Sequence, residues 1–283
     1  MAFADRIKAC NNFSRERVVP LVADRGRIGW LLRDNAAALT RFGDVFAVEG
    51  ERVRLVARGD VDTVSAAVDE VVEALVAENL LPKWRNETFD VMPRWGDPVI
   101  FRLDRGAVPF FGVRAYGVHL NGYRDVGSKL HLWIGRRAPD KRVAPDKLDN
   151  IVAGGIGNGH GIAATMVKEC DEEAGLPAAL VAHAVPVGAV TYCMETPLGV
   201  RDDILFVYDL EMPADVTPRN NDGEIVHFDL IPAADVIDRV RQTDDFKFNV
   251  NLIILDFAVR HGLIAVDDPE YLTVASSLHR PLD

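Results

Sequence analysis

Cysteine is scarce in this chain of 283 residues, which contains three: Cys10, Cys170 and Cys193. None of them stands in a Cys-x-x-Cys pair, so the common cysteine-based zinc sites are excluded. An odd and sparse set does not make a disulfide framework and favours a reducing compartment. We therefore expect a cytoplasmic protein.

Long apolar runs and an excess of positive charge are also missing. No apolar run approaches the ~20 residues that a membrane-spanning helix needs, so we expect no membrane segment. Acidic residues outnumber basic ones by 43 to 32, and the net charge is −11. This balance argues against a broad nucleic-acid-binding surface but leaves room for a local basic pocket. The expected partner is a small molecule, and the pattern fits a monomer or a homodimer equally.

A change of texture along the chain predicts its organisation. Up to residue 92, strand-like stretches accompany an amphipathic helix over residues 60–80, with Asp60 or Asp62 as its N-cap. Residues 93–109 are rich in proline and glycine and show little periodicity, and we place a domain boundary there. From Phe110 onward, strand-like segments surround internal helices. This order indicates a mixed α/β or α+β sandwich.

Residues 151–177 combine a loop of five glycines with an acidic helix. The helix is predicted to begin near residues 161–163 and to end at Gly175, which supplies a left-handed C-cap. Glu169, Glu172 and Glu173 stand at i, i+3 and i+4, so their carboxylates share one face. Such an oxygen-only set suits a hard cation such as Mg²⁺ or Mn²⁺. Taken alone, this charge spacing more often marks a solvated acidic face.

The glycine loop and the helix together resemble a known motif. From Gly154 the pattern G-x5-H-x7-K-E-C-x-E-E-x-G-L is similar to the Nudix box, G-x5-E-x7-R-E-U-x-E-E-x-G-U, where U is a bulky apolar residue. His160 stands where the family usually has Glu, and Lys168 where it has Arg. In the family these two positions chiefly brace the loop and helix. We expect His160 to brace the loop rather than to touch substrate or metal, and Lys168 to pair with carboxylates of its own helix.

This resemblance implies a fold and a division of the chain. The fold would be a Nudix α/β/α sandwich with a mixed sheet over residues 109–283. A smaller α+β domain over residues 1–108 would precede it and either cover the substrate or pack beside the site. The implied activity is metal-dependent hydrolysis of a diphosphate that is linked to another moiety.

The resemblance also implies roles for individual residues. Glu169 and Glu173 would be the main ligands of Mg²⁺ or Mn²⁺, and Glu172 would be a third ligand or would orient the attacking water. The catalytic set would be Glu172, Glu173 and Glu224. Glu224 opens a strand after a turn and would act as general base, the alternative being a surface glutamate. The loop glycines Gly154 and Gly155 would let the backbone approach the metal or phosphate.

Further polar residues are candidates for contact with substrate: Arg136, Arg137, His119, Asn121 and Lys247. One of the two arginines is expected to grip a phosphate while the other faces solvent. The strand residues His119 and Asn121 have the alternative of being satisfied by their neighbours. Lys247 has the alternative of a helix entry at which Asn249 is the N-cap. Asp149 and Asn150 are expected to pin the glycine loop.

The resemblance extends beyond the box to one branch of the family. AYGVHLNGY, LWIGRRA, KLDNIVAGG and NDGEI are similar to a branch that includes fungal proteins fused to thiamine pyrophosphokinase. GRIGWLL, FAVEG and PKWRNETFDV are similar to the N-terminal domain of that branch. The implied substrates are thiamine diphosphate and its oxidised or toxic analogues, cut to the monophosphate and phosphate.

Other readings of the sequence remain open. The substrate of a Nudix enzyme is in other cases ADP-ribose, a nucleotide sugar or a nucleoside triphosphate. A protein that binds its ligand without turnover would fit the two departures from the box. Four tryptophans are either core residues or candidates to stack on a substrate ring: Trp30, Trp84, Trp95 and Trp133.

Overall fold

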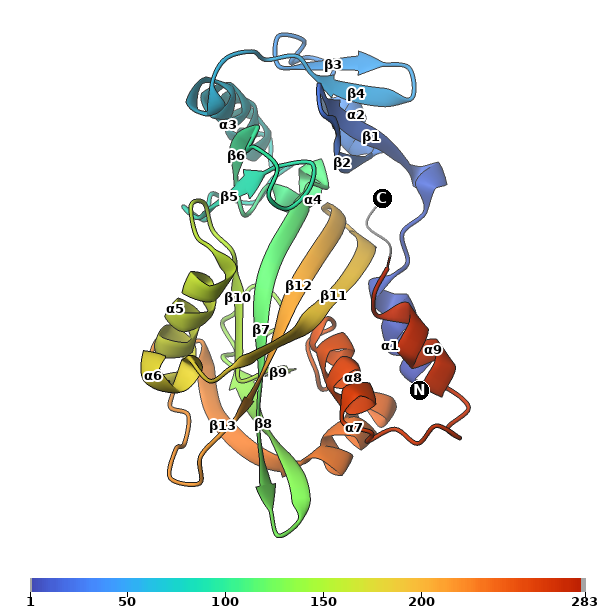
Figure 1. The fold of residues 1–283 in the computed structure, drawn as a ribbon. Coiled ribbons are helices and arrows are strands. Elements are labelled where there is room, and N and C mark those ends of the chain that lie inside the picture. Colours follow the sequence, from blue (N-terminus) through green and yellow to red (C-terminus); the bar gives the residue numbers. More distant parts are fainter. Residues whose placement is uncertain (1, 281–283) are drawn as a thin grey trace.

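A mixed sheet runs through the C-terminal part of the chain in a computed structural model that describes residues 2–280 (Figure 1). Its strands are β7 (Arg114–Val126), β8 (Lys129–Arg137), β9 (Leu148–Asp149), β10 (Val152–Gly155), β11 (Val185–Thr196), β12 (Gly199–Glu211) and β13 (Ile225–Pro232). The strand order is β11-β12-β7-β8-β13, while β10 pairs with β7 and β9 with β8. The pair β7–β12 is parallel and the other pairs are antiparallel.

Helices cover both faces of this sheet (Figure 1). On one face, α5 (Ile162–Ala174) and α6 (Ala178–Val181) share a buried apolar core with β7 and β10. On the other face, α7 (Ala233–Gln242) and α8 (Val250–Arg260) share a second core with β8 and β11. The α/β/α sandwich with a mixed sheet that the sequence predicts is confirmed. The site must therefore lie where loops and helix ends leave the sheet exposed.

Helix α5 ends where the sequence predicts, and for the predicted reason. Gly175 follows its last residue with a φ of 60°, a left-handed conformation that costs glycine little. The N–H of Gly175 donates to Asp171 O at 3.1 Å, and the N–H of Leu176 donates to Cys170 O at 3.0 Å. Met166 and Cys170 are buried against the sheet, as the apolar spacing of the helix requires.

A second, smaller sheet lies in the N-terminal part. Its strands are β1 (Val18–Ala23), β2 (Gly26–Leu32), β3 (Phe46–Glu49) and β4 (Arg52–Leu55), in the order β2-β1-β4-β3. A short 3₁₀ turn, η1 (Arg15–Arg17), precedes them, and α2 (Arg33–Ala38) follows β2. Helix α3 (Val61–Ala77) buries its apolar stripe in the core that it shares with this sheet. The predicted cap is confirmed, because the N–H of Thr63 donates to Asp60 Oδ1 at 2.8 Å.

The stretch expected to be an aperiodic boundary, residues 93–109, is instead partly ordered structure. Strand β6 (Phe101–Asp104) lies within this stretch and pairs antiparallel with β5 (Thr88–Val91), which falls in the region predicted to be strand-like. The short helix α4 (Val108–Phe111) follows. Phe101 and Leu103 are fully buried against α3. Strand β6 is only four residues long, which is too short for a clear alternation of apolar and polar residues. Figure 1 shows β5 and β6 directly above the loop that leads from β10 into α5.

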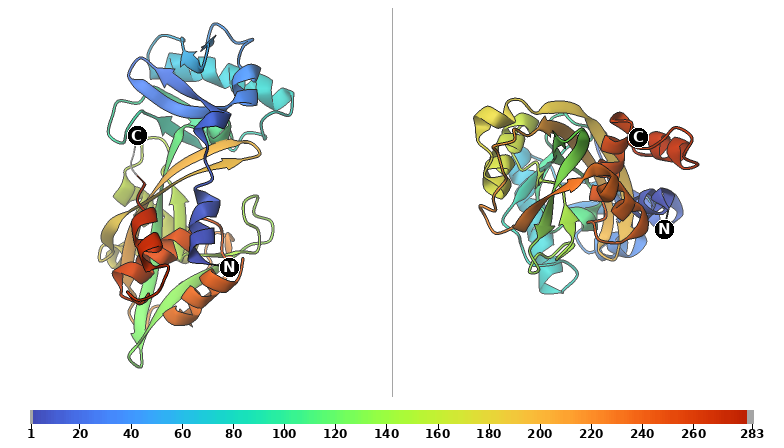
Figure 2. Two further views of the ribbon diagram at one scale, coloured as in Figure 1. Left: turned by 90° about the vertical axis from the view of Figure 1, so that its right-hand side faces the viewer. Right: turned by 90° about the horizontal axis from the view of Figure 1, so that it is seen from below.

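The two parts of the chain are joined at several points. Helix α1 (Phe3–Cys10) packs against α7, α8 and α9 (Tyr271–Ser277), so the chain begins on the C-terminal part before it forms the N-terminal sheet (Figure 2, left). The side-chain amide of Asn35 donates to Leu198 O at 2.9 Å and to Phe110 O at 3.0 Å. The division at residue 108 stays a prediction. None of the helices in residues 2–280 is long and apolar enough to cross a membrane.

Candidate active site

Two glutamates of α5 lie against the backbone of β10. Glu169 crosses Gly154 so closely that a Cβ at that glycine would lie 2.2 Å from Glu169 Cγ. At the preceding residue, the N–H of Ala153 donates to Glu173 Oε2 at 2.8 Å. Two neighbouring residues of one strand therefore position both carboxylates. Gly154 is required because any side chain there would displace Glu169.

The negative charge of this pair is poorly balanced. Burial raises the pKa of Glu173 well above its ordinary value, and the Ala153 N–H opposes the rise. Three nearby carboxylates raise it further: Asp149, Glu169 and Glu224. Burial also raises the pKa of Glu169, against the opposing effect of Lys168. A cation near both carboxylates would stabilise their charged forms.

Lys168 and Glu172 lie at the edge of this group. Lys168 Nζ lies 2.6 Å from Glu172 Oε2 and 3.1 Å from Glu169 Oε1, which confirms the predicted pairing within the helix. Among residues 2–280, no three Asp, Glu, His or Cys side chains form a preformed metal site. Glu169 and Glu173 are the pair that β10 positions together, and a third contact from Glu172 stays a prediction. That pair suits Mg²⁺, which usually takes one or two carboxylates and completes its shell with phosphate and water.

The loop between β10 and α5 is braced by the N-terminal part. The N–H of Asn158 donates to Thr88 O at 2.8 Å, and the N–H of Gly159 donates to Asp90 Oδ2 at 3.1 Å. Both acceptors belong to β5. The expected bracing by His160 is not found, because its exposed ring makes no hydrogen bond with any residue of the described chain. The backbone and side-chain contacts from β5 therefore brace the loop in place of the residue at position 160.

A cleft of about 610 Å³ opens beside Gly154 and Gly155. Its walls come from the segment around β5, from β7, β10 and β12, and from the loop after β8. None of the three glutamates of α5 lines this cleft, and Glu169 lies against Gly154 from outside it. Two wall carboxylates nevertheless affect them: Glu87 raises the pKa of Glu169, and Glu224 raises that of Glu173. The cleft is therefore the space in which a substrate would meet the glutamates.

Glu224 lines this cleft and forms an ion pair with Lys141, whose Nζ lies 2.6 Å from its Oε1. Its backbone O accepts from the Ala138 N–H at 2.9 Å, which ties the start of β13 to the end of β8. This placement at the wall is compatible with the predicted catalytic role. The alternative of a surface glutamate fits as well, because Glu224 is partly exposed and already paired with Lys141.

The two arginines at the end of β8 have different surroundings. Arg137 lines the cleft, but its guanidinium donates to Asp149 Oδ2 at 2.7 Å and to the carbonyls of Ala144 and Val143. These bonds hold the loop between β8 and β9. Arg136 donates to Asp146 O at 2.7 Å and does not line the cleft. Both side chains thus serve the loop. Arg137 uses Nε, Nη1 and Nη2 for it, Arg136 lies away from the cleft, and a grip on phosphate by either one stays a prediction.

His119 and Asn121 belong to a buried chain of hydrogen bonds. His119 Nδ1 lies 2.8 Å from Asn150 Oδ1, Asn150 Nδ2 donates to Asn121 Oδ1 at 2.9 Å, and Asn121 Nδ2 donates to Asp209 Oδ1 at 3.0 Å. Asn121 is 1% exposed and does not line the cleft. The expected substrate contact of Asn121 is therefore corrected: both ends of its amide have interior partners. His119 reaches the cleft wall, and burial, with Lys247 nearby, lowers the pKa of its ring to about 4.

Lys247 also lines the cleft. Its Nζ donates to Asp149 Oδ2 at 3.2 Å, the same oxygen that receives Arg137. Burial alone would raise the pKa of Asp149, but the two cations outweigh it and hold that pKa below its ordinary value. Asp149 thereby pins the start of the glycine loop, as expected. Asn249 stands at the start of α8 without a side-chain cap bond, and its buried Oδ1 has no partner among the described residues.

Two protein-family models and several known proteins match this chain. A family model described as "NUDIX domain" matches residues 122–250, and one described as "Domain of unknown function (DUF4743)" matches residues 2–115. Nudix hydrolase 20, chloroplastic, of Arabidopsis thaliana is 36% identical over 98% of this chain and 77% of its own length. Nudix hydrolase 24, chloroplastic, of the same plant is 37% identical over 95% of this chain and 75% of its own length.

This chain belongs to the Nudix hydrolase family. It is a hydrolase, and the substrates that membership supports are derivatives of nucleoside diphosphates. The crystal structure of DR0079 from Deinococcus radiodurans is 23% identical, covers 59% of this chain and 97% of its own, and has a TM-score of 0.47. The cytoplasmic location and the branch remain predictions.

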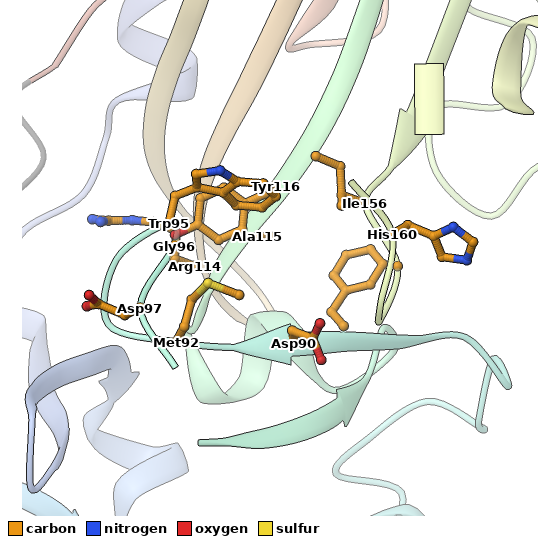
Figure 3. Close-up of a pocket in the computed structure, with 12 residues that line it drawn as sticks. Asp90, Met92, Trp95, Gly96, Asp97, Arg114, Ala115, Tyr116, Ile156 and His160 are labelled. Carbon is orange, nitrogen blue, oxygen red and sulfur yellow. The ribbon is translucent and has the colours of Figure 1, made fainter. Parts of the chain in front are cut away.

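A second pocket adjoins the Nudix cleft and is lined mainly by apolar side chains (Figure 3). It measures about 220 Å³ and shares Phe89, Ala115 and Tyr116 with the larger cleft. The rings of Trp95 and Tyr116 lie edge to face, 4.7 Å apart. Figure 3 shows these two rings beside one another, with His160 across the pocket.

Two of the four tryptophans line a pocket, and the other two pack against neighbouring side chains. Trp95 lines the apolar pocket and Trp84 lines the cleft, so both remain candidates for stacking. Trp30 packs against Phe13 with ring centroids 5.4 Å apart, and Trp133 is buried in the core of the α5 face.

Sequence reasoning missed the arginines that line the cleft from outside the Nudix box: Arg85, Arg105, Arg142 and Arg201. Arg85 lies within PKWRNETFDV, a segment that drew attention only as a family resemblance. A search for basic residues in segments that resemble the family would have found Arg85. Arg142 and Arg201 carry no such signal, since each stands in an ordinary loop or strand.

Proposed function

We propose that this Nudix hydrolase cleaves thiamine diphosphate, or its oxidised or toxic analogues, to the monophosphate and phosphate in the presence of Mg²⁺ or Mn²⁺. The observation that carries the proposal is the junction of two unlike pockets. A basic cleft beside the box suits a diphosphate, and the apolar pocket with Trp95 and Tyr116 suits an aromatic ring. Asp90, Asp97 and Arg114 also line the apolar pocket, and two carboxylates against one guanidinium favour a positively charged ring such as thiazolium.

The residues of the box would each have a defined task. Glu169 and Glu173 would hold the cation, since β10 positions both and burial leaves their charge uncompensated. A bound Mg²⁺ or Mn²⁺ would neutralise diphosphate oxygens and lower the pKa of a coordinated water. Glu224 would accept a proton from the attacking water at the cleft wall, and Lys141 would keep its carboxylate there. Gly154 and Gly155 would let the diphosphate approach the backbone of β10.

A second candidate substrate is a nucleoside diphosphate derivative such as ADP-ribose. The apolar pocket supports it as well, because a nucleobase would stack on Trp95 without needing a positive charge. The two candidates differ in the ring and in whether the diphosphate is terminal or bridging.

Phosphate release from a panel of compounds separates these readings. The panel holds oxythiamine diphosphate, thiamine diphosphate, ADP-ribose, NADH and dGTP, each with Mg²⁺, with Mn²⁺ and with a chelator. The bridged compounds receive a phosphatase after the reaction, and dGTP receives an inorganic diphosphatase so that released diphosphate is detected. We expect the highest kcat/KM for the thiamine compounds and no turnover with chelator. A higher kcat/KM for ADP-ribose or dGTP would replace the thiamine proposal. Micromolar binding with no turnover of any compound would favour a silent binder.

A further inference from the structure

Four arginines gather in the cleft of an acidic protein. The net charge of the chain is −11, yet Arg85, Arg105, Arg142 and Arg201 all line this one cavity. Burial lowers the pKa of the Arg85 guanidinium, and the positive charges of the other three lower it further. Like charges held this closely repel one another, and an anion between them removes the repulsion.

The Arg85 side chain is partly buried, and its buried Nε has gained no protein partner. Its Nε is buried and makes no hydrogen bond within residues 2–280. The backbone around it is well anchored, because the N–H groups of Arg85 and Asn86 both donate to Asp104 Oδ2 at 3.0 Å. Buried donors in proteins are nearly always paired. A guanidinium on an anchored backbone with an unpaired buried Nε is therefore suited to a ligand with acceptor oxygens.

Of the other three arginines, Arg105 and Arg201 have partners among the described residues and Arg142 has none. Arg105 donates to Glu87 Oε2 at 2.8 Å. The guanidinium carbon of Arg201 lies 5.7 Å from the ring centroid of Phe248, and its Nη1 lies 3.9 Å from Asp203 Oδ2. Arg142 is exposed on the loop after β8 and has no hydrogen bond or ion pair with a described residue. Arg85 and Arg142 thus keep their donor capacity, while Arg105 and Arg201 are held at the sides.

This group lies beside the Nudix box rather than at a remote surface. Arg85, Gly154 and Gly155 line the same cavity. Glu87, two residues after Arg85, is close enough for its charge to raise the pKa of Glu169. A phosphate held by the arginines would therefore lie next to the glutamates that face β10.

We propose that Arg85, supplied by the N-terminal part, and Arg142 bind the terminal phosphate of the substrate between them, with Arg105 and Arg201 flanking it. This inference rests on the proposed function only in taking the substrate to be a diphosphate. It makes the N-terminal part a component of the active site that determines specificity. A terminal phosphate has a second ionisation near pH 6 and carries close to two negative charges at neutral pH. A bridging phosphate carries one, so the chain should prefer diphosphate monoesters over bridged compounds such as ADP-ribose.

The direct test measures binding without turnover. Inorganic diphosphate is titrated calorimetrically into the full chain in the absence of divalent metal, for the wild type, Arg85→Met, Arg142→Met and Arg94→Met. Arg94 is an exposed arginine of the same N-terminal part that does not line the cleft, so its variant is the matched control. We expect the Kd to rise about 10- to 100-fold in Arg85→Met and Arg142→Met, as for loss of a charged hydrogen bond. Arg94→Met should bind as the wild type does.

Arg142 is exposed, so its variant stays informative even if Arg85→Met lowers the melting temperature. Equal Kd values for wild type, Arg85→Met and Arg142→Met would overturn the proposal. A loss of affinity in Arg94→Met as large as in the other two would overturn it as well, because the effect would then be one of net charge.

Kinetics then separate this inference from the proposed function. With thiamine diphosphate, Arg85→Met should raise KM at least about 10-fold and change kcat less, whereas any turnover of ADP-ribose should change little. Arginine-dependent binding of diphosphate without turnover of any panel compound would uphold the subsite and reject the proposed function. Turnover of thiamine diphosphate with unchanged KM in Arg85→Met and Arg142→Met would reject the subsite and leave the proposed function in place.

Discussion

The glutamates of the Nudix box and the arginines of the neighbouring cleft carry opposite charge and are assembled in different ways. The glutamate side is local: Glu169 and Glu173 come from one helix and are positioned by two adjacent residues of β10. The arginine side is assembled from segments between residues 85 and 201, two of them outside the C-terminal sandwich. A diphosphate needs a cation at one end and positive side chains at the other. In the proposed site, the Nudix box therefore supplies only the half that holds the cation.

Glu173→Gln should have the largest effect on the glutamate side. The substitution keeps the shape of the side chain and removes one of the two charges that would hold the cation. We expect turnover to fall at least ~100-fold, as for the loss of a metal ligand. Phosphate release with Mg²⁺ measures it, and the binding of metal-free diphosphate serves as a control that should persist. Turnover at the wild-type rate would remove Glu173 from the site.

Gly154→Ala should disturb the same side through geometry. The new Cβ would lie 2.2 Å from Glu169 Cγ, so the carboxylate must leave its position against β10. We expect kcat to fall about 10- to 100-fold, which is smaller than the loss of a charge because the glutamate is still present. Gly161→Ala is the matched control, since its Cβ would meet no atom within 4 Å. Equal rates in the two variants would mean that the contact does not matter.

His119 should make the stability of the fold depend on pH. Burial, with Lys247 nearby, lowers the pKa of its ring from 6.5 to about 4. Between these values the unfolded chain binds a proton that the folded chain refuses, so stability falls as pH falls from 6.5 toward 4. The contribution has a slope of up to ~1.4 kcal/mol per pH unit. Urea unfolding at pH 6.5 and 4.5 should show a smaller difference for His119→Gln, and an unchanged difference would assign the pH dependence to other groups.

His160→Glu should have the smallest effect. It restores the residue that the family usually has, but the loop is already braced by Thr88 and Asp90 of β5. We expect kcat/KM within about threefold of the wild type, because the bonds that fix the loop come from its backbone. Complete inactivation would give His160 a direct role in the pocket that it lines. Asp90→Ala, which removes a bracing acceptor, should lower activity more than His160→Glu.

The sequence alone determined those features that depend on residues a few positions apart. The spacing of Glu169, Glu172 and Glu173 fixes them on one side of a helix, because the 3.6-residue turn leaves no other arrangement. Gly175 ends that helix for an equally local reason, and the order of strands and helices indicated the mixed sandwich. Lys168 pairs with Glu172 one turn away, as expected.

Only the tertiary structure decided which distant segments meet. It turned Asn121 inward to Asp209, committed Arg137 to Asp149 and the loop it holds, and placed β5 against the glycine loop. It also brought four arginines around one cavity. None of these contacts follows from a local period, because each depends on how the two parts of the chain pack over residues that are far apart in sequence. The box could be read from its spacing, whereas the arginines proposed to bind the anion come together only after the chain has folded.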